Sequence, residues 1–355
     1  MAEDSPGVPS PRGQVLAGRV MLLDPVGEGG AGVIWRARDL RTEQVVAAKV
    51  LRQADAGSLL RFVQESSTRI RHEHVLAPTT WVAEDGQVAL LMELVDGGSV
   101  ASLVGDFGAL PPLLVAELLR QACDGLQAIH DAGLVHRDIT PANLLLRATG
   151  AGRPHLLVSD FGVAVRLDGP RLTRVDHVVG TPGYSAPEQE RGSDPAPTQD
   201  LYALGRVAQE MLTGVRPGAA DEVAPVLPGE APPVLRDIVR SLLATDAADR
   251  PVSAADARAR LDHPDLAWRA DAIGEVEVLE HVVGPDTPPE SPLSLPGRGP
   301  VPEPVEDGAA QEGLVADADD LPPARRREGR GLVVSLAVVA VLSAAVLLWA
   351  LAQLL

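Results

Sequence analysis

The chain contains one lysine, Lys49, and one asparagine, Asn143, although Lys and Arg together number 31 in its 355 residues. Because the other basic positions are all arginine, the remaining lysine indicates a site where a compact ammonium cannot be replaced by a planar guanidinium. Lys49 closes the string Val-Ala-Ala-Lys, and Asn143 closes His-Arg-Asp-Ile-Thr-Pro-Ala-Asn, which also contains Asp138. An ammonium group can bind phosphate. A carboxylate can accept a proton or bind a cation, and an amide oxygen can bind a cation.

A glycine-rich string, Gly27-Glu28-Gly29-Gly30-Ala31-Gly32, has the G-x-G-x-x-G spacing of phosphate-binding loops. A dinucleotide-binding fold needs a helix directly after such a loop, but Val33-Ile34-Trp35 is typical of a strand. Asp160-Phe161-Gly162 begins seventeen residues after Asn143, and Ala186-Pro187-Glu188 follows later. Each short match is common by chance, but the ordered series is not. The series resembles the eukaryotic-type protein kinases, and its closest likeness is to bacterial Ser/Thr kinases of the Hanks type.

The resemblance assigns chemistry to individual residues. Lys49 would pair with the α- and β-phosphates of ATP and would be held by Glu65. Asp138 would accept the proton of the substrate hydroxyl, and Asn143 and Asp160 would hold Mg²⁺, with Mn²⁺ as an alternative. The nucleotide site that the resemblance implies comprises Gly27, Glu28, Gly29, Gly30, Ala31, Gly32, Ile34, Ala47, Lys49, Met92, Glu93, Val95, Asn143 and Asp160.

Further residues match the family's substrate-binding and scaffold segments. Thr181 would reach toward the catalytic aspartate, and Asp200 would brace the catalytic loop. Glu188 and Arg250 would form a buried structural ion pair. Arg137 precedes the catalytic aspartate, where it would bind a phosphorylated activation loop, and Thr173 is the expected phosphate acceptor. The resemblance therefore implies transfer of the γ-phosphoryl group of Mg-ATP to Ser/Thr hydroxyls of proteins, with autophosphorylation of the activation loop.

One position departs from the family pattern. Thr140 stands where Ser/Thr kinases usually carry a lysine that contacts the γ-phosphate. Losing one such preorganised donor costs up to about 2.7–4 kcal/mol of transition-state stabilisation. Two alternatives stay open: a pseudokinase scaffold that binds nucleotide or protein partners with little catalysis, and a kinase of small molecules. Retention of Lys49, Asp138, Asn143 and Asp160 disfavours the scaffold. The presence of an activation segment disfavours the kinase of small molecules.

The elements that must position these residues form an α+β, two-lobed kinase fold over residues 16–264. Strands are expected over 20–26, 33–37, 45–51 and 88–94, with a helix over 59–70, and the pattern turns helical from Pro111. The hinge between a small β-rich lobe and a larger helical lobe is expected near residues 93–96. Cys123 lies in an apolar helical run and is expected to be a small buried hydrophobe.

Both ends of the chain differ in composition from this body. Residues 1–15 are polar and are expected to be disordered, without a signal peptide. Residues 265–330 are acidic and Pro-rich, as in disordered linkers, and end in a basic juxtamembrane segment. Residues 332–355 carry no charge, so residues 331–355 are expected to form a single transmembrane helix.

The charge distribution bears on location and partners. The arginines before the uncharged run place the kinase domain in the cytoplasm and the C-terminus at the outer face of the cell membrane. Ala340 and Ala344 have a spacing that allows helices to pair, so a homodimer is an open alternative. The net charge of −18 argues against nucleic acid as a partner. Protein substrates and the lipid bilayer, contacted through residues 332–355, are the expected partners.

Overall fold

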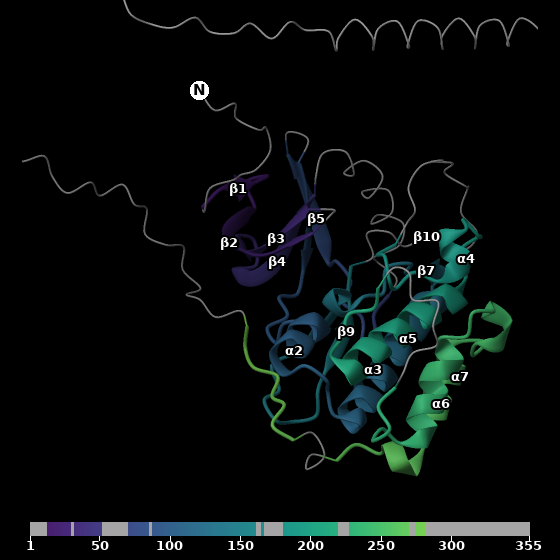
Figure 1. Cartoon of the computed structure of the whole chain (residues 1–355). Coiled ribbons are helices and arrows are strands. Elements are labelled where there is room, and N and C mark those ends of the chain that lie inside the picture. The colour runs from purple at the N-terminus through teal and green to yellow at the C-terminus, as the bar shows by residue number, and fades with distance from the viewer. Residues whose placement is uncertain are drawn as a thin grey trace, which may run out of the picture. The chain divides into compact units, whose positions relative to one another are not determined.

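The computed structural model of the chain describes residues 13–29, 32–51, 70–84, 87–160, 165–166, 180–218, 227–269 and 274–281. All of them belong to the first of two compact units, Met1–Ser294. A β-sheet lies at one end of this unit and a bundle of helices at the other (Figure 1). The expected α+β arrangement of a β-rich lobe followed by a helical lobe is confirmed.

The β-rich lobe is one antiparallel sheet with the strand order β1-β2-β3-β4-β6-β5. Its strands are β1 (Val15–Leu16), β2 (Val20–Gly29), β3 (Gly32–Asp39), β4 (Gln44–Leu51), β5 (Thr80–Glu84) and β6 (Gln87–Met92). Four of them match expected strands, and β1 and β5 were not expected. The expected helix over 59–70 lies outside the described residues except at Ile70.

The two faces of the central strand β4 have different roles. Ala48 is buried in an apolar cluster with Trp35 and Leu91, its neighbours on the adjacent strands. Lys49 points to the opposite face because successive strand residues alternate. It lies in register between Ile34 of β3 and Leu90 of β6. Strand alternation therefore fixes the side of the sheet to which the lone lysine is directed.

The helical lobe is built around one long helix. The helices and short strands are α2 (Val100–Phe107), α3 (Pro112–Asp131), β7 (Leu134–Val135), η1 (Pro141–Asn143), β8 (Leu144–Leu146), β9 (Leu156–Val158), β10 (Val165–Arg166), α4 (Pro187–Glu190), α5 (Pro197–Thr213), α6 (Pro233–Leu242), η3 (Ala247–Asp249), α7 (Ala254–Leu261) and η4 (Pro264–Leu266). Most of α3 is buried, and its apolar residues share one core with α5, α6 and α7. Cys123 lies inside this core, and burial raises the pKa of its thiol to about 12, so it behaves as a small hydrophobe as expected.

The folded body continues past residue 264, where the sequence placed the start of the linker. Leu266 is fully buried in the core of the helical lobe, and Val276 and Val278 are buried in the same core. The acidic composition of this stretch hid the alternation of glutamate and valine from 275 to 278, which is typical of a strand packed on one side. The described residues that pack on the helical lobe therefore extend to His281, seventeen residues beyond the predicted boundary at residue 264.

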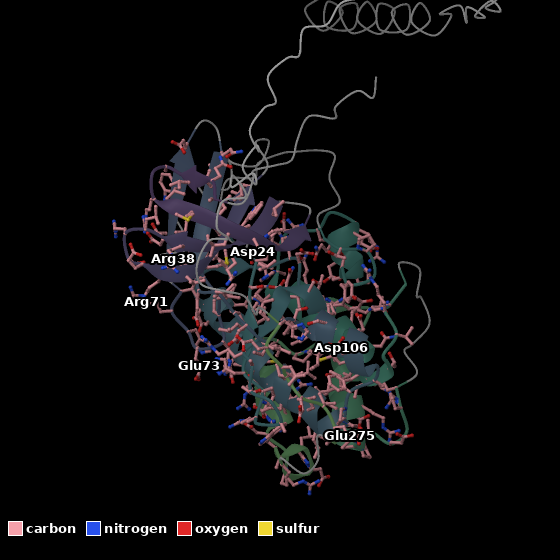
Figure 2. All side chains as sticks on the ribbon, turned by 90° about the vertical axis from the view of Figure 1, so that its left-hand side faces the viewer. Asp24, Arg38, Arg71, Glu73, Asp106 and Glu275 are labelled. Atoms are coloured by element: carbon pink, nitrogen blue, oxygen red, sulfur yellow. The ribbon has the colours of Figure 1, made fainter. Side chains whose placement is uncertain are left out.

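Within the part of the chain that the structure describes, no helix has both the length and the hydropathy needed to cross a bilayer. The residues expected to form a transmembrane helix, 331–355, lie outside that part. Charged side chains are spread over both lobes, among them Arg38 on the sheet and Asp106 on the helical lobe (Figure 2).

Candidate active site

The backbone just before Asp138 is held in place by one carboxylate, that of Asp200. Asp200 in α5 has no solvent exposure, and its Oδ1 accepts a hydrogen bond from the Arg137 backbone N–H at 2.7 Å. Its Oδ2 accepts from the His136 N–H at 2.9 Å and from the His130 Nε2 at 2.9 Å. Three donors on a buried carboxylate fix the backbone just before Asp138.

Two neighbours orient the side chain of Asp138. The Thr181 hydroxyl donates to its Oδ1 at 2.7 Å, and the Asn143 Nδ2 donates to its Oδ2 at 3.1 Å. The same Nδ2 also donates to the Asp138 carbonyl oxygen at 2.8 Å. The Asp138 carboxylate is thus held from two parts of the chain, by Asn143 in its own loop and by Thr181, which lies 43 residues further along the sequence.

Lys49 contacts Asp160 directly. The Lys49 Nζ lies 2.5 Å from the Asp160 Oδ1, and Lys49 is 6% exposed while the Asp160 side chain keeps 32% of its exposure. An ammonium and a carboxylate from the two lobes therefore meet at one point. Several expected site residues lie outside the described residues, and these are Glu65, Gly30, Ala31 and Thr173.

Asn143 and Asp160 are the residues that could hold a divalent cation. The nitrogen of the Asn143 amide is directed to Asp138, which leaves its oxygen as a cation ligand. The Asn143 backbone carbonyl accepts from both the N–H and the hydroxyl of Ser159 at 2.9 Å, so the residue before Asp160 is tied to Asn143. Carboxylate and amide oxygens are the donors that Mg²⁺ and Mn²⁺ take. The donor set fits such a cation, although no preformed cluster of three His, Cys, Asp or Glu ligands occurs among the described residues.

The nucleotide residues expected on the sheet are brought together by strand register. Gly27 lies opposite Ile34, and Ile34 lies opposite Lys49. Ala47 pairs in register with Met92, the last residue of β6. Gly32 cannot carry a side chain, because a Cβ there would stand 2.1 Å from the Val50 carbonyl oxygen. The backbone of Glu28 and Gly29 belongs to β2.

The expected hinge directly follows β6. Glu93 turns its side chain outward to a two-point ion pair with Arg147, whereas Val95 is buried at 8% exposure against Leu76 and Leu157. The Glu93 side chain therefore points away from the connection between the lobes, and only its backbone forms part of that connection. Figure 2 shows Glu73 in the segment before β5, and this segment contacts the helical lobe through the Leu76 N–H, which donates to the Val158 carbonyl at 2.9 Å.

The scaffold ion pair has the expected partners. Arg250 is fully buried through its side chain, and its two Nη atoms donate to the Glu188 carboxylate at 2.6 and 2.9 Å. It also donates to the carbonyl oxygens of Ala244, Thr198 and Thr245, and its guanidinium carbon lies 4.8 Å from the centre of the Tyr202 ring. The pair joins the end of the activation segment to the loop before α7.

Among the described residues, Arg137 presents an unpaired donor next in sequence to Asp138. Its Nε is buried and has no hydrogen-bond partner among the residues that the structure describes. Burial lowers the pKa of the guanidinium, and the charge of Asp200 opposes this shift. The Arg137 carbonyl accepts from the Gln189 amide at 2.9 Å. His130, Ser159 and Gln189 are site neighbours that the sequence did not predict, since only the packing of distant segments brings them here.

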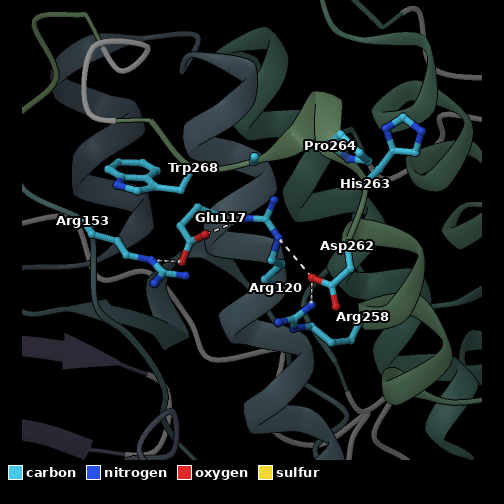
Figure 3. Close-up of a pocket in the computed structure, with 9 residues that line it drawn as sticks. Glu117, Arg120, Arg153, Arg258, Asp262, His263, Pro264 and Trp268 are labelled. Carbon is cyan, nitrogen blue, oxygen red and sulfur yellow. Dashed lines mark hydrogen bonds and ion pairs between the residues drawn. The ribbon is translucent and has the colours of Figure 1, made fainter.

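A cavity of about 380 Å³ lies in the helical lobe, between α3 and the segment after α7. Figure 3 shows Glu117 between Arg153 and Arg120, and Arg258 beside Asp262. Burial raises the pKa of the Glu117 carboxyl, but hydrogen bonds from Arg153 and Gln121 and the arginine charges lower it overall. Each arginine there is engaged by a carboxylate, so the cluster joins α3 to the C-terminal end of the lobe.

The comparisons with known proteins agree with this geometry. Residues 21–258 match the model of the protein kinase domain. The chain belongs to the protein kinase family. It is 33% identical over 311 residues to the serine/threonine-protein kinase PkaA of Streptomyces coelicolor, covering 79% of this chain and 56% of that protein.

Other bacterial members of the family are similarly related. The chain is 35% identical over 263 residues to the serine/threonine-protein kinase PknA of Mycobacterium tuberculosis, covering 68% of this chain and 60% of that protein. It is 39% identical over 221 residues to drp72 of Corynebacterium efficiens. The matched part spans less than two thirds of the length of these relatives. The resemblance to bacterial Hanks-type kinases is thereby confirmed at the level of the family.

Proposed function

We propose that the chain transfers the γ-phosphoryl group of ATP, bound with Mg²⁺ or Mn²⁺, to Ser/Thr hydroxyls of proteins. The observation that carries the proposal is the Asp138 carboxylate, which is held by Thr181 at 2.7 Å and by Asn143 at 3.1 Å. Lys49 contacts Asp160 at 2.5 Å, and Ser159, the residue before Asp160, donates to the Asn143 carbonyl. The family membership of its relatives, which are named serine/threonine-protein kinases, supports the same chemistry.

The residues divide the reaction between them. Asp138 orients the acceptor hydroxyl and takes its proton as the new O–P bond forms, while the bond from the γ-phosphorus to the bridging oxygen of ADP breaks. Lys49 holds the α- and β-phosphates with a point charge from the sheet. Asn143 and Asp160 would hold the divalent cation, which when bound neutralises charge on the phosphates. Glu65 is the proposed second partner of Lys49.

Arg137 is the proposed regulatory residue. Its buried, unpartnered Nε is the kind of donor that binds a phosphate through charge-assisted hydrogen bonds. Autophosphorylation of Thr173 would supply that phosphate. Phosphopeptide mapping tests the assignment, because modification found only at other residues would remove Thr173 from this role.

We further propose that residues 331–355 anchor the kinase domain to the cytoplasmic face of the cell membrane, with the C-terminus at the outer face. Support comes from the run of 24 uncharged residues, 332–355, and the arginines that precede it. Pairing of two such helices through Ala340 and Ala344 would give a homodimer. Fractionation of the full-length chain, compared with a variant that carries two aspartates within 332–355, tests the anchor: both forms in the soluble fraction would contradict it.

The central test uses the full-length chain with labelled ATP, Mg²⁺ and a generic protein substrate. Wild type is expected to label protein, and Asp138→Asn is expected to abolish the label while leaving nucleotide binding intact. Asp237→Asn provides a matched control, because Asp237 lies on the exposed side of α6 and its side chain is 73% exposed. Label that persists in Asp138→Asn, or absence of label in a wild type that binds nucleotide, would overturn the proposal.

A pseudokinase scaffold is the second candidate, and Thr140 is the observation that favours it. The residue is buried at 7% exposure and lacks the cation that would contact the γ-phosphate. Thr140→Lys separates the two readings. A rise in kcat of up to about 10²–10³-fold from a measurable wild-type rate would identify a slowed kinase, whereas wild-type binding of nucleotide without turnover would identify a scaffold. Label on a small molecule and none on protein would favour a small-molecule kinase.

A further inference from the structure

The segment from Gly274 to His281 packs on the helical lobe as an irregular, strand-like tail. Val276 and Val278 are buried at 7% and 4% exposure in the core of that lobe, whereas Glu275 and Glu277 between and before them are exposed. Figure 1 shows the pale green trace of this tail beside α2, and Figure 2 shows Glu275 and Asp106 on the helical lobe. Side chains alternate in and out, so the tail is bound by one face.

Backbone hydrogen bonds fix the register of the tail. Val278 pairs with Gly150 as an antiparallel bridge, and its N–H donates to the Gly150 carbonyl at 2.9 Å. The Val278 carbonyl accepts from the N–H groups of Gly150 and Thr149 at 2.9 and 3.1 Å. Three hydrogen bonds at one residue leave the tail no freedom to slide along the loop after β8.

The tail ends at the hinge between the lobes. The His281 backbone N–H donates to the Asp96 carbonyl at 2.7 Å. Its ring covers Gly98, where an added Cβ would lie 3.1 Å from two ring carbons, and its Nε2 stands 4.0 Å from the Asp106 carboxylate. The end of the tail therefore contacts Asp96, the last residue of the hinge, Gly98 just before α2, and Asp106 in the last turn of α2.

The other side of the hinge is held by the segment after β8. The Gly97 N–H donates to the Leu146 carbonyl at 2.8 Å, and the Ala148 N–H donates to the Asp96 carboxylate at 2.9 Å. Asp96 is thus held by its side chain from the loop and by its carbonyl from the tail. The loop and the tail are themselves joined through Gly150 and Val278, so hinge, loop and tail form one closed set of contacts.

We propose that residues 274–281 are a strap that positions the hinge for nucleotide binding. The inference rests on the proposed function, since it concerns the ATP affinity of the same site. Removing the strap leaves the Asp96 carbonyl without its N–H donor and lets the hinge backbone move relative to β6. The loss of one or two ordering hydrogen bonds corresponds to a roughly three- to tenfold weaker binding of nucleotide.

The strap also couples the rest of the chain mechanically to the nucleotide site. The chain continues in sequence from His281, so a pull transmitted along it from the residues that follow would act first on the contact between His281 and Asp96. Val278 is the anchor that resists such a pull, because it combines burial in the core with three backbone hydrogen bonds.

The test compares point variants of the full-length chain. Val278→Asp places a charge in the core and detaches the strap, and Leu279→Asp is its matched control because the neighbouring Leu279 is 55% exposed. His281→Pro removes the N–H that reaches Asp96, and His281→Ala keeps that N–H while removing the ring. Thermal unfolding of each variant defines a temperature at which it is folded.

At that temperature we expect Val278→Asp and His281→Pro to raise the Kd for a fluorescent Mg-ATP analogue three- to tenfold, and to raise the KM for ATP with kcat nearly unchanged. Both control variants should bind as wild type does. Hydrogen exchange at the hinge amides should accelerate in Val278→Asp. Wild-type nucleotide affinity in both strap variants would overturn the inference. Absence of nucleotide binding in wild type would instead refute the proposed function, while the exchange measurement would still decide whether the strap holds the hinge.

Discussion

Replacing Asp200 by asparagine should loosen the catalytic loop without creating a cavity. The two side chains have nearly the same volume, but asparagine offers one oxygen where aspartate offers two. In the structure Oδ2 accepts from His136 and His130, and Oδ1 accepts from Arg137. The asparagine oxygen can take the place of Oδ2 and keep two donors, which leaves its own NH₂ facing the Arg137 N–H.

The magnitude follows from that lost acceptor. Asp200 has no solvent exposure, so the Arg137 N–H would be left buried and unpaired, at a cost of about 2–3 kcal/mol in the free energy of unfolding. For a domain of this size about 2–4 °C of Tm corresponds to each kcal/mol, so Tm should fall by roughly 5–10 °C. A displacement of Asp138 by about 1 Å costs up to roughly 10²-fold in rate.

Calorimetry and phosphoryl-transfer kinetics on the same preparations measure both effects. Asp237→Asn is the matched control, because its side chain is 73% exposed and pairs only with the neighbouring Arg240. The control should change Tm by less than about 2 °C. We expect kcat to fall while the KM for ATP stays nearly constant. An Asp200→Asn variant with wild-type Tm and wild-type kcat would refute the view that this carboxylate positions the loop.

Three further outcomes follow from buried charged groups. Lys49→Arg should lower kcat by about 10²-fold or more, because a guanidinium does not fit the 6% exposed site, and labelled phosphoryl transfer within tenfold of wild type would contradict this. Arg250→Met should cost roughly 2–4 kcal/mol in urea unfolding, below the range for a fully buried pair because Glu188 keeps 21% exposure, and an unchanged urea midpoint would argue against the pair. Burial lowers the pKa of His74, so the unfolded chain takes up a proton at a higher pH than the folded chain does. The contribution of His74 to the free energy of unfolding should therefore be fully present above about pH 6.5 and should fall as the pH is lowered from there toward the folded-state pKa. His74→Asn, which retains a donor for the Leu156 carbonyl, should flatten that dependence, and equal slopes in both proteins would exclude His74 as the cause.

The sequence predicted the reacting residues better than their supports. Lys49, Asp138, Asn143 and Asp160 stand in strings whose residue types are restricted by chemistry, and the structure brings Lys49 to Asp160 and Asn143 to Asp138. Whether they carry out the proposed roles stays a prediction. His130, by contrast, contacts Asp200 only because α3 packs on α5, and no local pattern encodes a contact between residues 70 positions apart.

The fold was missed where composition and local pattern disagreed. The strand β5 has five residues and only one buried side chain, Val82, so its pattern was too weak to separate from a loop. The strap was assigned to a linker because it lies in residues 265–330, a stretch that is acidic and Pro-rich as a whole. Val276 and Val278 nevertheless alternate with glutamate at the strand period, and two buried valines suffice when backbone hydrogen bonds fix the rest.

Backbone strain in the described chain is concentrated at the candidate site. Four residues other than glycine have positive φ, and while Ala17 and Glu43 lie in turns, Arg137 and Asp160 lie beside the proposed reacting groups at φ +67° and +64°. Such conformations cost about 1–3 kcal/mol and persist only where the surroundings impose them.

The two strained residues are held by different means. Asp200 accepts from the Arg137 N–H and Gln189 donates to the Arg137 carbonyl, so groups of the helical lobe alone hold that conformation. Asp160, in contrast, is bound through its side chain by Lys49, which belongs to the other lobe. The position of Asp138 is therefore a property of the helical lobe, whereas that of Asp160 also depends on how the sheet is placed. A contact that fixes the hinge consequently acts on Lys49 and Asp160 before it acts on Asp138.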